Sequence, residues 1–417
     1  MYKRLIIFLF ALMSVAVAGR AQQYCTAIFK DNISTLRLKY ADTDELERPF
    51  LTLSGDEQLD ISFDELSHDT HFYTYTLVHL NHDFTRSPLQ SSEYLDGFTT
   101  ADISDYDHSS LTQTLYTHYR LLFPNDEIRA KVSGNYAIVI YEDGNPDDIV
   151  ATVVFQVAEQ SADISASVRG NTDIEFNNRL QQLDIDVDLQ SNNITNPSEV
   201  MLVVKQNNRT DNQVVLSRPT FINNNLLRYV NQKALIFEGG NEYRRFDISS
   251  VYIKGTHVDQ IVYDHRDYHA FLFADELRAD MPYVNETDAD GQYVINVEKR
   301  TDNDYEADYM FVHFMLNADE PFLDGRMYVA GDFTQNMLTP NNMMQYDAEH
   351  HCYTYTALLK QGGYEYNYLF VRKAQSSATT IPAEGSHWQT QNEYTILVYY
   401  HPFGARYDRL LAIKRIR

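Results

Sequence analysis

The chain has 417 residues, of which 44% are hydrophobic, and its formal charge at pH 7 is −25. This length allows two or three domains of about 100–200 residues each, with enough apolar residues to fill their cores. The negative charge would repel the phosphates of nucleic acids and anionic lipid headgroups, so we expect no nucleic-acid partner. A basic rim or a protein surface fits this charge better, although acidity also simply keeps a protein soluble.

The first 21 residues have the pattern of a secretory signal peptide. Lys3 and Arg4 precede an apolar run over residues 5–18, and a Gly-Arg-Ala site follows it. Loss of this leader, which contains three cations, changes the formal charge from −25 to −28. No later apolar run approaches the ~20 residues that span a bilayer, and Cys25 lacks the small-residue box of a lipoprotein. We therefore expect an exported protein with no lipid anchor and no direct membrane insertion.

The two cysteines, Cys25 and Cys352, are too few for a disulfide framework. A single bridge between them stays open as the less favoured alternative, because a bridge requires a close approach that sequence does not reveal. Stability must therefore come from buried side chains.

Short strand-like segments recur along the whole chain. They alternate in hydrophobicity or are rich in β-branched and aromatic residues, and clusters of Gly, Asn and Asp that favour turns separate them. No long segment has a clean 3.6-residue period. Short strands at regular spacing predict an all-β protein built of tandem β-sandwiches, immunoglobulin-like or early-set-like. In chain order the predicted strands are residues 71–80, 135–142, 149–157, 200–206, 269–275, 309–316, 326–333, 353–359, 364–371 and 394–401.

Two polar stretches predict boundaries between the sandwiches. AEQSAD, at residues 158–163, ends a long run of strands, and KRTDNDYEAD, at residues 299–308, separates two others. After the signal peptide at residues 1–21 we expect an N-terminal sandwich, a middle sandwich and a C-terminal early-set-like sandwich. Their predicted bounds are residues 22–158, 159–302 and 303–417.

The stretch YTLVHLNHDF, residues 75–84, contains two histidines and an aspartate, the residue types of a metal or acid–base centre. In a strand, however, His79 and His82 point to opposite faces because they are three residues apart. His79 shares a face with Asp83, and we expect a surface hydrogen bond for an imidazole at such a strand end. The stretch therefore predicts a wall of the first sandwich rather than a metal site.

The stretch LDIDVDLQ, residues 183–190, alternates strictly between aliphatic and polar residues. In a strand its aliphatic residues point inward, and Asp184, Asp186 and Asp188 lie on one outer face about 7 Å apart. Such a row could bind calcium or meet a cationic partner. Charged outer faces also prevent sheets from aggregating, and we favour that interpretation.

Calcium-loop and nucleophile motifs do not identify a catalytic centre. The stretch NETDADGQYVINVE departs from a calcium loop at its first position, Glu286, and at its twelfth, Val297, so we predict an Asp-Gly hairpin turn there. The chain lacks G-x-S-x-G, H-E-x-x-H, Cys-x-x-Cys and phosphate-loop motifs. We therefore predict no enzymatic activity, no cofactor and no bound metal, although sequence does not show which carboxylates come close together.

Aromatic residues are abundant, with 31 tyrosines and 22 phenylalanines, and many lie in polar segments such as SSEYLDGF and YYHPFGARYDR. Tyrosine combines a large apolar area with a polar tip, and with arginine it is enriched at the centres of protein contacts. Most of these rings should fill β cores. The remainder would form a recognition surface.

The same aromatic segments carry a resemblance to a known family. The chain closely resembles the plug protein family of the type IX secretion system of Bacteroidota through eight blocks in order: SGDEQLDISFDELS, YTLVHLNHDF, SEYLDGF, YTHYRLLFPNDEIR, SGNYAIVIYEDG, FEGGNEYRRFDI, ADYMFVHFML and EGSHWQTQNEYTILVYYHPFGARYDRLL. The resemblance covers essentially the whole chain after the signal peptide. It implies a periplasmic, outer-membrane-associated protein that seals the periplasmic opening of the large β-barrel translocon when no cargo is present.

A seal of this kind would contact the translocon through aromatic and arginine side chains, and reversible closure favours a moderate interface with a polar rim. Packing between the protein's own sandwiches is the alternative role for each such residue. The predicted contact residues are Tyr94, Leu95, Tyr119, Arg120, Phe123, Tyr243, Arg244, Phe403 and Arg406.

The C-terminal part is also similar to early-set sandwiches that bind glycogen, through RMYVAGDFTQNMLTP and YTYTALLKQGGYEYNYLFV. Where sugar-binding members carry a tryptophan, residues 334–337 read Thr-Gln-Asn-Met, which removes the stacking platform. A secreted glycan-binding protein is the first alternative function, and it would have to use Trp388, the single tryptophan. Cargo of the same secretion system and a hydrolase are the others.

Overall fold

The computed structural model describes residues 23–43, 46–190, 192, 194, 196–298 and 302–417. The predicted signal peptide, residues 1–21, lies outside the described residues. Strands dominate the remainder, so the predicted all-β fold is confirmed. No helix in the described ranges is both long and apolar enough to cross a membrane. The helices are single turns: α1 (Ser91–Tyr94), α2 (Asn303–Glu306), α3 (Ile381–Glu384), and the 3₁₀ turns η1 (Pro197–Glu199), η2 (Lys233–Leu235), η3 (Asp332–Thr334) and η4 (Pro340–Asn342).

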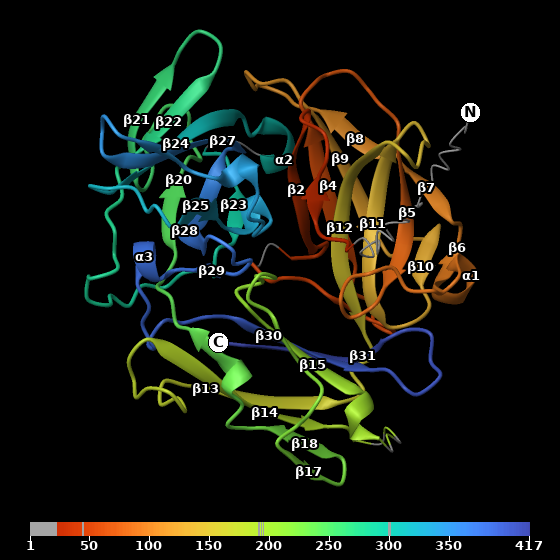
Figure 1. Ribbon diagram of the computed structural model, residues 1–417. Helices are drawn as coiled ribbons and strands as arrows, with labels where there is room; N and C mark the ends of the chain where they lie inside the picture. The colour runs from red at the N-terminus through yellow and green to blue at the C-terminus, as the bar shows by residue number, and fades with distance from the viewer. Residues whose placement is uncertain (1–22, 44–45, 191, 193, 195, 299–301) are drawn as a thin grey trace, which may run out of the picture.

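The first sandwich encloses one core between two sheets (Figure 1). One sheet has the order β1 (Ala27–Ile28), β12 (Ile149–Ala158), β11 (Gly134–Glu142), β5 (Tyr73–Leu80), β7 (Thr100–Ile103), with β3 (Leu51–Thr52) beside β12. The other has the order β2 (Ile33–Tyr40), β4 (Leu59–Glu65), β9 (Thr117–Phe123), β8 (Asp105–His108). A small ribbon joins β6 (Leu95–Gly97) to β10 (Ile128–Ala130). The predicted wall at YTLVHLNHDF is confirmed as β5, whose Tyr75 and Leu77 point into the core.

The middle sandwich consists of two sheets. The first has the order β13 (Asp163–Arg169), β14 (Leu180–Asp188), β18 (Leu226–Tyr229), β17 (Phe221–Asn223), and β19 (Ile236–Glu238) also pairs with β14. The second sheet has the order β16 (Val214–Leu216), β15 (Val200–Gln206), β30 (Tyr394–Tyr400), β31 (Arg409–Ile416). The predicted alternation on β14 is confirmed, because Leu183, Ile185 and Val187 are buried in the core between these sheets. On the outer face Asp184 and Asp186 pair with arginines of neighbouring strands.

The third sandwich also has two sheets around one core. In the first, β28 (Gly362–Arg372) lies between β20 (Arg244–Asp247) and β23 (Tyr293–Ile295) and also pairs β25 (Gly325–Ala330) and β29 (Ala378–Thr379). The second has the order β21 (Val258–Tyr263), β22 (Tyr268–Leu272), β24 (Tyr309–Asn317), β27 (Cys352–Lys360), β26 (Gln345–Asp347). Most pairs are antiparallel, but β22 and β24 run parallel.

The strand pairings do not follow the predicted division at residue 302. β30 and β31 come from the end of the chain, yet β30 pairs with β15 of the middle sandwich. Conversely, β20 and β23 precede residue 302 and pair with β28 of the third sandwich. The third sandwich is therefore inserted between two segments of the middle one, as the colours in Figure 1 show. Local patterns predict strands, whereas long-range packing selects their partners.

The sheet β16-β15-β30-β31 buries residues on both faces. On β15, Leu202 and Val204 point into the core of the middle sandwich. Val203, on the opposite face, forms a separate cluster with Leu397 of β30 and with Ala158 of β12 in the first sandwich. Side chains alternate across a strand, so this sheet is a central layer that packs against two sandwiches at once.

Two local predictions have mixed outcomes. Cys25 and Cys352 are both free thiols, so no bridge links them. The Asp-Gly turn is present, with positive φ at Asp290 and Gly291 (53° and 84°), but the residues before it form no strand and the turn closes no hairpin. Asp290 is instead buried and forms an ion pair with Arg417 at 2.9 Å, which holds the C-terminus against the third sandwich.

A fragment of residues 159–302 tests the insertion. We expect it to show no cooperative thermal unfolding by circular dichroism, because it lacks β30 and β31 and so exposes one side of its core. As a control, residues 159–239 joined to residues 392–417 through a flexible Gly/Ser linker should melt cooperatively. A cooperative melt of the 159–302 fragment would contradict the observed pairing.

Candidate functional site

Five of the nine predicted contact residues are buried in the protein's own interior. Phe123 packs against Phe155, with ring centroids 5.2 Å apart, and Tyr119 donates a hydrogen bond to the backbone carbonyl of His71. Such side chains fill cores and cannot reach a partner without unfolding of the site. The five residues are Tyr94, Leu95, Tyr119, Phe123 and Tyr243.

Two of the predicted arginines are held by carboxylates within the protein. Arg120 forms an ion pair with Asp60 at 2.9 Å. Arg244 lies between Asp275 (2.7 Å) and Glu384 (3.0 Å), and its side chain is only 10% exposed. Both guanidinium groups therefore stabilise the fold. Their geometry fits the alternative role, contact within the protein itself, better than contact with a partner.

Phe403 and Arg406 lie on the loop of residues 401–408 between β30 and β31, and both are exposed. The Phe403 side chain is 98% exposed. Arg406 pairs with Glu93 at 2.7 Å and donates to the backbone carbonyl of Pro88, so the loop is tied to the first sandwich. A fully exposed phenylalanine on a tied loop has no internal packing role, and such rings commonly anchor protein contacts.

The base of this loop is held by two histidines around one carboxylate. Asp408 accepts hydrogen bonds from His82 and from His401, each at 2.7 Å, and also from the backbone N–H of His82 at 2.8 Å. Burial opposes the charge of Asp408, but the hydrogen bonds from His82 lower its pKa to about 2. The hydrogen bond to Asp408 in turn raises the pKa of His82.

The two histidines of YTLVHLNHDF have separate roles, because His79 lies on β5 whereas His82 lies in the turn after the strand has ended at Leu80. The predicted opposite faces of one strand therefore do not describe His82. The expected surface hydrogen bond of His79 is wrong, because this imidazole is 1% exposed. It contacts Ser87 Oγ at 2.9 Å and the backbone carbonyl of Ser133 at 3.1 Å. The loop that follows β5 returns to the strand, where the Ser87 N–H donates to the His79 carbonyl at 3.0 Å, and the alternation pattern does not reveal this return. Within the described residues no group of three or more His, Cys, Asp or Glu side chains could hold a metal ion.

A buried polar cluster joins the first sandwich to the third. Asp64 and His118 are cross-strand partners on β4 and β9, and Tyr309 and Lys360 are cross-strand partners on β24 and β27. Cross-strand partners share one face of a sheet, so each sandwich presents a polar pair to the other. We call these four residues the polar joint.

Asp64 lies at the centre of the polar joint. Its carboxylate accepts hydrogen bonds from His118, Tyr309 and Lys360, each at 2.6 Å. The Lys360 and Asp64 side chains are both 0% exposed. The Lys360 ammonium also donates to the backbone carbonyl of Asp304 at 2.7 Å and lies 4.1 Å from the centroid of the Tyr116 ring.

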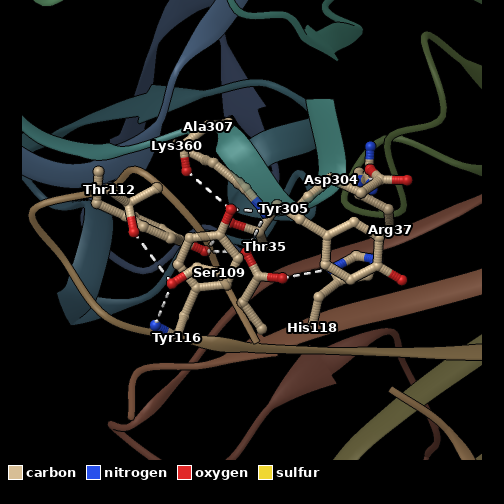
Figure 2. A network of polar contacts seen from close by, with 12 residues as sticks. Thr35, Arg37, Ser109, Thr112, Tyr116, His118, Asp304, Tyr305, Ala307 and Lys360 are labelled. Carbon is tan, nitrogen blue, oxygen red and sulfur yellow. Dashed lines mark hydrogen bonds and ion pairs between the residues drawn. The ribbon is translucent and has the colours of Figure 1, made fainter. Parts of the chain in front are cut away.

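Neighbouring residues extend the contact between the two sandwiches (Figure 2). Tyr116 of the first sandwich donates to the backbone carbonyls of Asp304 and Ala307, at 3.0 and 2.9 Å. Arg37 on β2 forms an ion pair with the Asp304 side chain. Tyr116 and Arg37 thus both hold the short helix α2 against the first sandwich.

The polar joint contains the residue types of an acid–base centre, but its chemistry is structural. Burial on its own would raise the pKa of Asp64, whereas Lys360 and His118 hold the pKa of this carboxyl below its ordinary value. The ionised pair is closed to solvent, so no substrate can reach it. A charged residue that points inward from an apolar strand, as in ISFDELS or ALLKQGG, is the sequence signal that we did not use.

A central cavity of about 750 Å³ lies where the three sandwiches meet. Its lining comes from all three and includes Val154, Lys205, Tyr293 and Arg415. None of the predicted contact residues lines it, so the sequence-based prediction missed this site entirely.

The Lys360→Met variant tests the polar joint. Loss of the Lys360 ammonium leaves Asp64 buried without its lysine partner, so we expect the free energy of unfolding to fall by about 3–5 kcal/mol. The double variant Asp64→Asn with Lys360→Met removes both charges and should recover part of this loss. Urea unfolding measures both, with the exposed Lys414→Met as a control that should change stability by less than about 0.5 kcal/mol. A loss below about 1 kcal/mol for Lys360→Met would contradict this account.

The pKa of His82 predicts how stability depends on pH. A histidine whose folded-state pKa is raised stabilises the fold fully below its unfolded pKa, and this contribution is lost as pH rises through the folded value. His82→Gln should therefore cost roughly 1.5 kcal/mol at pH 6, as expected for a hydrogen bond to a charged group, and less at pH 9. Asp408 stays ionised throughout this window. Urea unfolding at both pH values provides the test, and an equal loss at both would refute it.

Comparisons with known proteins agree with this architecture. A family described as the type 9 secretion system plug protein first domain matches residues 33–159, which form most of the first sandwich. The crystal structure of a hypothetical protein from Parabacteroides merdae has a TM-score of 0.93 and 41% sequence identity, and the match covers 95% of this chain and 100% of that one. No curated protein matches. The chain belongs to the type 9 secretion system plug protein family.

Proposed function

We propose that the protein seals the periplasmic opening of the outer-membrane β-barrel translocon of the type 9 secretion system when no cargo is present. The match of the first sandwich to the plug family carries this proposal. On this proposal the protein acts in the periplasm, to which the signal peptide predicted at residues 1–21 would deliver it, and its partner would hold it at the outer membrane. In this role the protein would be a passive structural component, which the match to the plug family supports.

A seal must keep its shape when it is pressed against a pore, and three features support such rigidity. The polar joint fixes the first sandwich to the third, with the Asp64–Lys360 pair fully buried. The central sheet packs the middle sandwich against the first through Val203 and Ala158. The C-terminal Arg417 pairs with Asp290 of the third sandwich. These contacts leave the three sandwiches little freedom to move separately.

The loop of residues 401–408 is the best candidate for contact with the translocon. It presents Phe403 almost fully to solvent, while the His401–Asp408 hydrogen bond joins the two ends of the loop and Arg406 pairs with Glu93 of the first sandwich. An anchor on an ordered loop loses little conformational entropy on binding. Of the nine predicted contact residues, Phe403 and Arg406 are the two that we keep for this role.

A glycan-binding function has no specific support. Trp388 is only partly exposed and packs closely over Gly170, where an added Cβ would lie 2.5 Å from its ring. Its backbone N–H donates to the carbonyl of Asn178. The single tryptophan therefore serves the packing of the middle sandwich instead of offering a flat platform to a sugar ring.

Affinity purification tests the proposed function directly. The tagged protein, captured from an outer-membrane extract, should retain the large translocon barrel, identified by mass spectrometry. Cells that lack the protein but keep the barrel should take up small dyes that an intact outer membrane excludes faster than wild-type cells do. An eluate without the barrel, or an unchanged permeability, would refute the sealing role.

The Phe403→Ser variant tests the contact loop. Loss of a central aromatic anchor should reduce binding to the barrel about tenfold or more, while the melting temperature stays unchanged because the ring packs against nothing. Phe176→Ser, at a second exposed phenylalanine (72% exposed) in the middle sandwich, is the matched control and should bind normally. Equal retention of the barrel by both variants would exclude Phe403 as an anchor.

A further inference from the structure

The wall of the central cavity carries a row of polar residues across three neighbouring strands. Lys205 on β15 is the cross-strand partner of Thr395 on β30, and Thr395 is the cross-strand partner of Arg415 on β31. Partners in register share one face of the sheet, and all three residues line the cavity. With strands about 4.8 Å apart, the Lys205 and Arg415 backbones lie about 10 Å apart. Their long side chains can therefore reach one group held between them.

Both cations of this row lack a carboxylate partner among the described residues. Lys205 is 93% buried, since its side chain and backbone together are 7% exposed, and no ion pair or hydrogen bond engages its ammonium group. The ammonium lies 4.5 Å from the centroid of the Phe84 ring. The Arg415 guanidinium lies 5.3 Å from the centroid of Phe50, and its Nε is buried without a hydrogen-bond acceptor.

These aromatic contacts offset only part of the cost of burial. A ring face attracts a cation but accepts none of the hydrogen bonds that water would accept. Burial accordingly lowers the pKa of Lys205 to about 8 and lowers the pKa of Arg415. Lys205, with a pKa of about 8, is mostly charged at pH 7, and a guanidinium stays protonated in proteins. The cavity wall therefore carries one buried and one partly buried positive charge in a protein whose formal charge is −25.

The other charged groups of the cavity are already engaged or exposed. Arg37 pairs with Asp304, and Arg48 pairs with Asp332 and with Glu393. Lys39 lies 3.8 Å from Asp60, and Asp302 accepts hydrogen bonds from backbone N–H groups of α2. The charges of Glu393 and of the exposed Glu47, which lines the cavity, attract the Arg415 guanidinium, but neither carboxylate forms an ion pair with it. Lys205 and Arg415 are thus the cations in this lining that remain free for a ligand.

The cavity also offers an apolar surface. Leu36, Val154, Met337 and Leu397 line it together with the Phe84 ring. Its volume of about 750 Å³ falls within the roughly 300–1,000 Å³ of small-molecule sites. Two cations without an ion-pair partner, one buried and one partly buried, beside an apolar wall match a ligand with an acidic head and an apolar body.

We propose that the central cavity binds an amphipathic organic anion, with its acidic head group between Lys205 and Arg415 and its apolar body along the aliphatic wall. The anion would supply the acceptors that both cations lack. This site is separate from the Phe403 loop, and the proposal does not depend on the sealing function.

Isothermal titration of the purified protein at pH 7 with three probes of equal chain length tests the charge preference. Decanoate, decanol and decyltrimethylammonium share an apolar body and differ in head group. We expect decanoate to bind at least about tenfold more tightly than the cationic probe, against the sign of the protein's net charge. Equal or tighter binding of decyltrimethylammonium would overturn the proposal.

Substitutions locate the head group. Lys205→Met keeps the apolar stem and removes the charge, so decanoate affinity should fall about tenfold or more while decanol affinity stays unchanged. Arg415→Gln should act in the same direction and serves if Lys205→Met does not fold, as judged by near-ultraviolet circular dichroism. Lys414→Met, the exposed neighbour on β31, is the control and should bind decanoate as the parent protein does. Unchanged decanoate binding by the Lys205 or Arg415 variant would overturn the proposed head-group site. Decanol affinity that falls as much as decanoate affinity would show that the two cations do not recognise the acidic head, and would also overturn it.

Discussion

The fully buried ion pair between Asp64 and Lys360 joins two sandwiches whose described strands share no sheet. Taking both charges out of water is costly, and the pair persists because His118, Tyr309 and the Asp304 carbonyl complete its hydrogen bonds. Such a contact tolerates little displacement, since a shift would leave a charge buried and unpaired. It therefore sets the relative orientation of the first and third sandwiches, and the space between them follows from that orientation.

The central sheet sets the remaining geometry. It needs apolar residues on both faces, because the middle core lies on one side and the first sandwich on the other. Beyond the area that the first sandwich covers, the same outer face borders the central cavity, and there Lys205 and Arg415 replace the apolar residues. A cation at the end of an otherwise buried strand is costly to the fold. Its presence beside a cavity is more readily explained by a ligand than by stability.

Family membership and surface geometry contribute different parts of the functional account. The match to the plug family supports the proposed place in a secretion system, and the three firmly joined sandwiches suit the proposed role of blocking a pore by shape. Of the nine predicted contact residues, Phe403 and Arg406 are the two that are exposed, and only these two enter the proposed contact with the translocon. The cavity is a separate feature, and a bound anion there would also bridge all three sandwiches.

Hydrophobic alternation alone determined the all-β character and strand positions such as β5 and β14, because a period of two residues is a local property of the chain. The family resemblance rested equally on contiguous blocks. Only the tertiary structure decided that β30 and β31 complete the middle sandwich, that Tyr119 and Phe123 are core residues, and that Asp64 meets Lys360. Strand pairing, burial and charge pairing join residues far apart in the chain, and no local pattern records which distant segment packs against which.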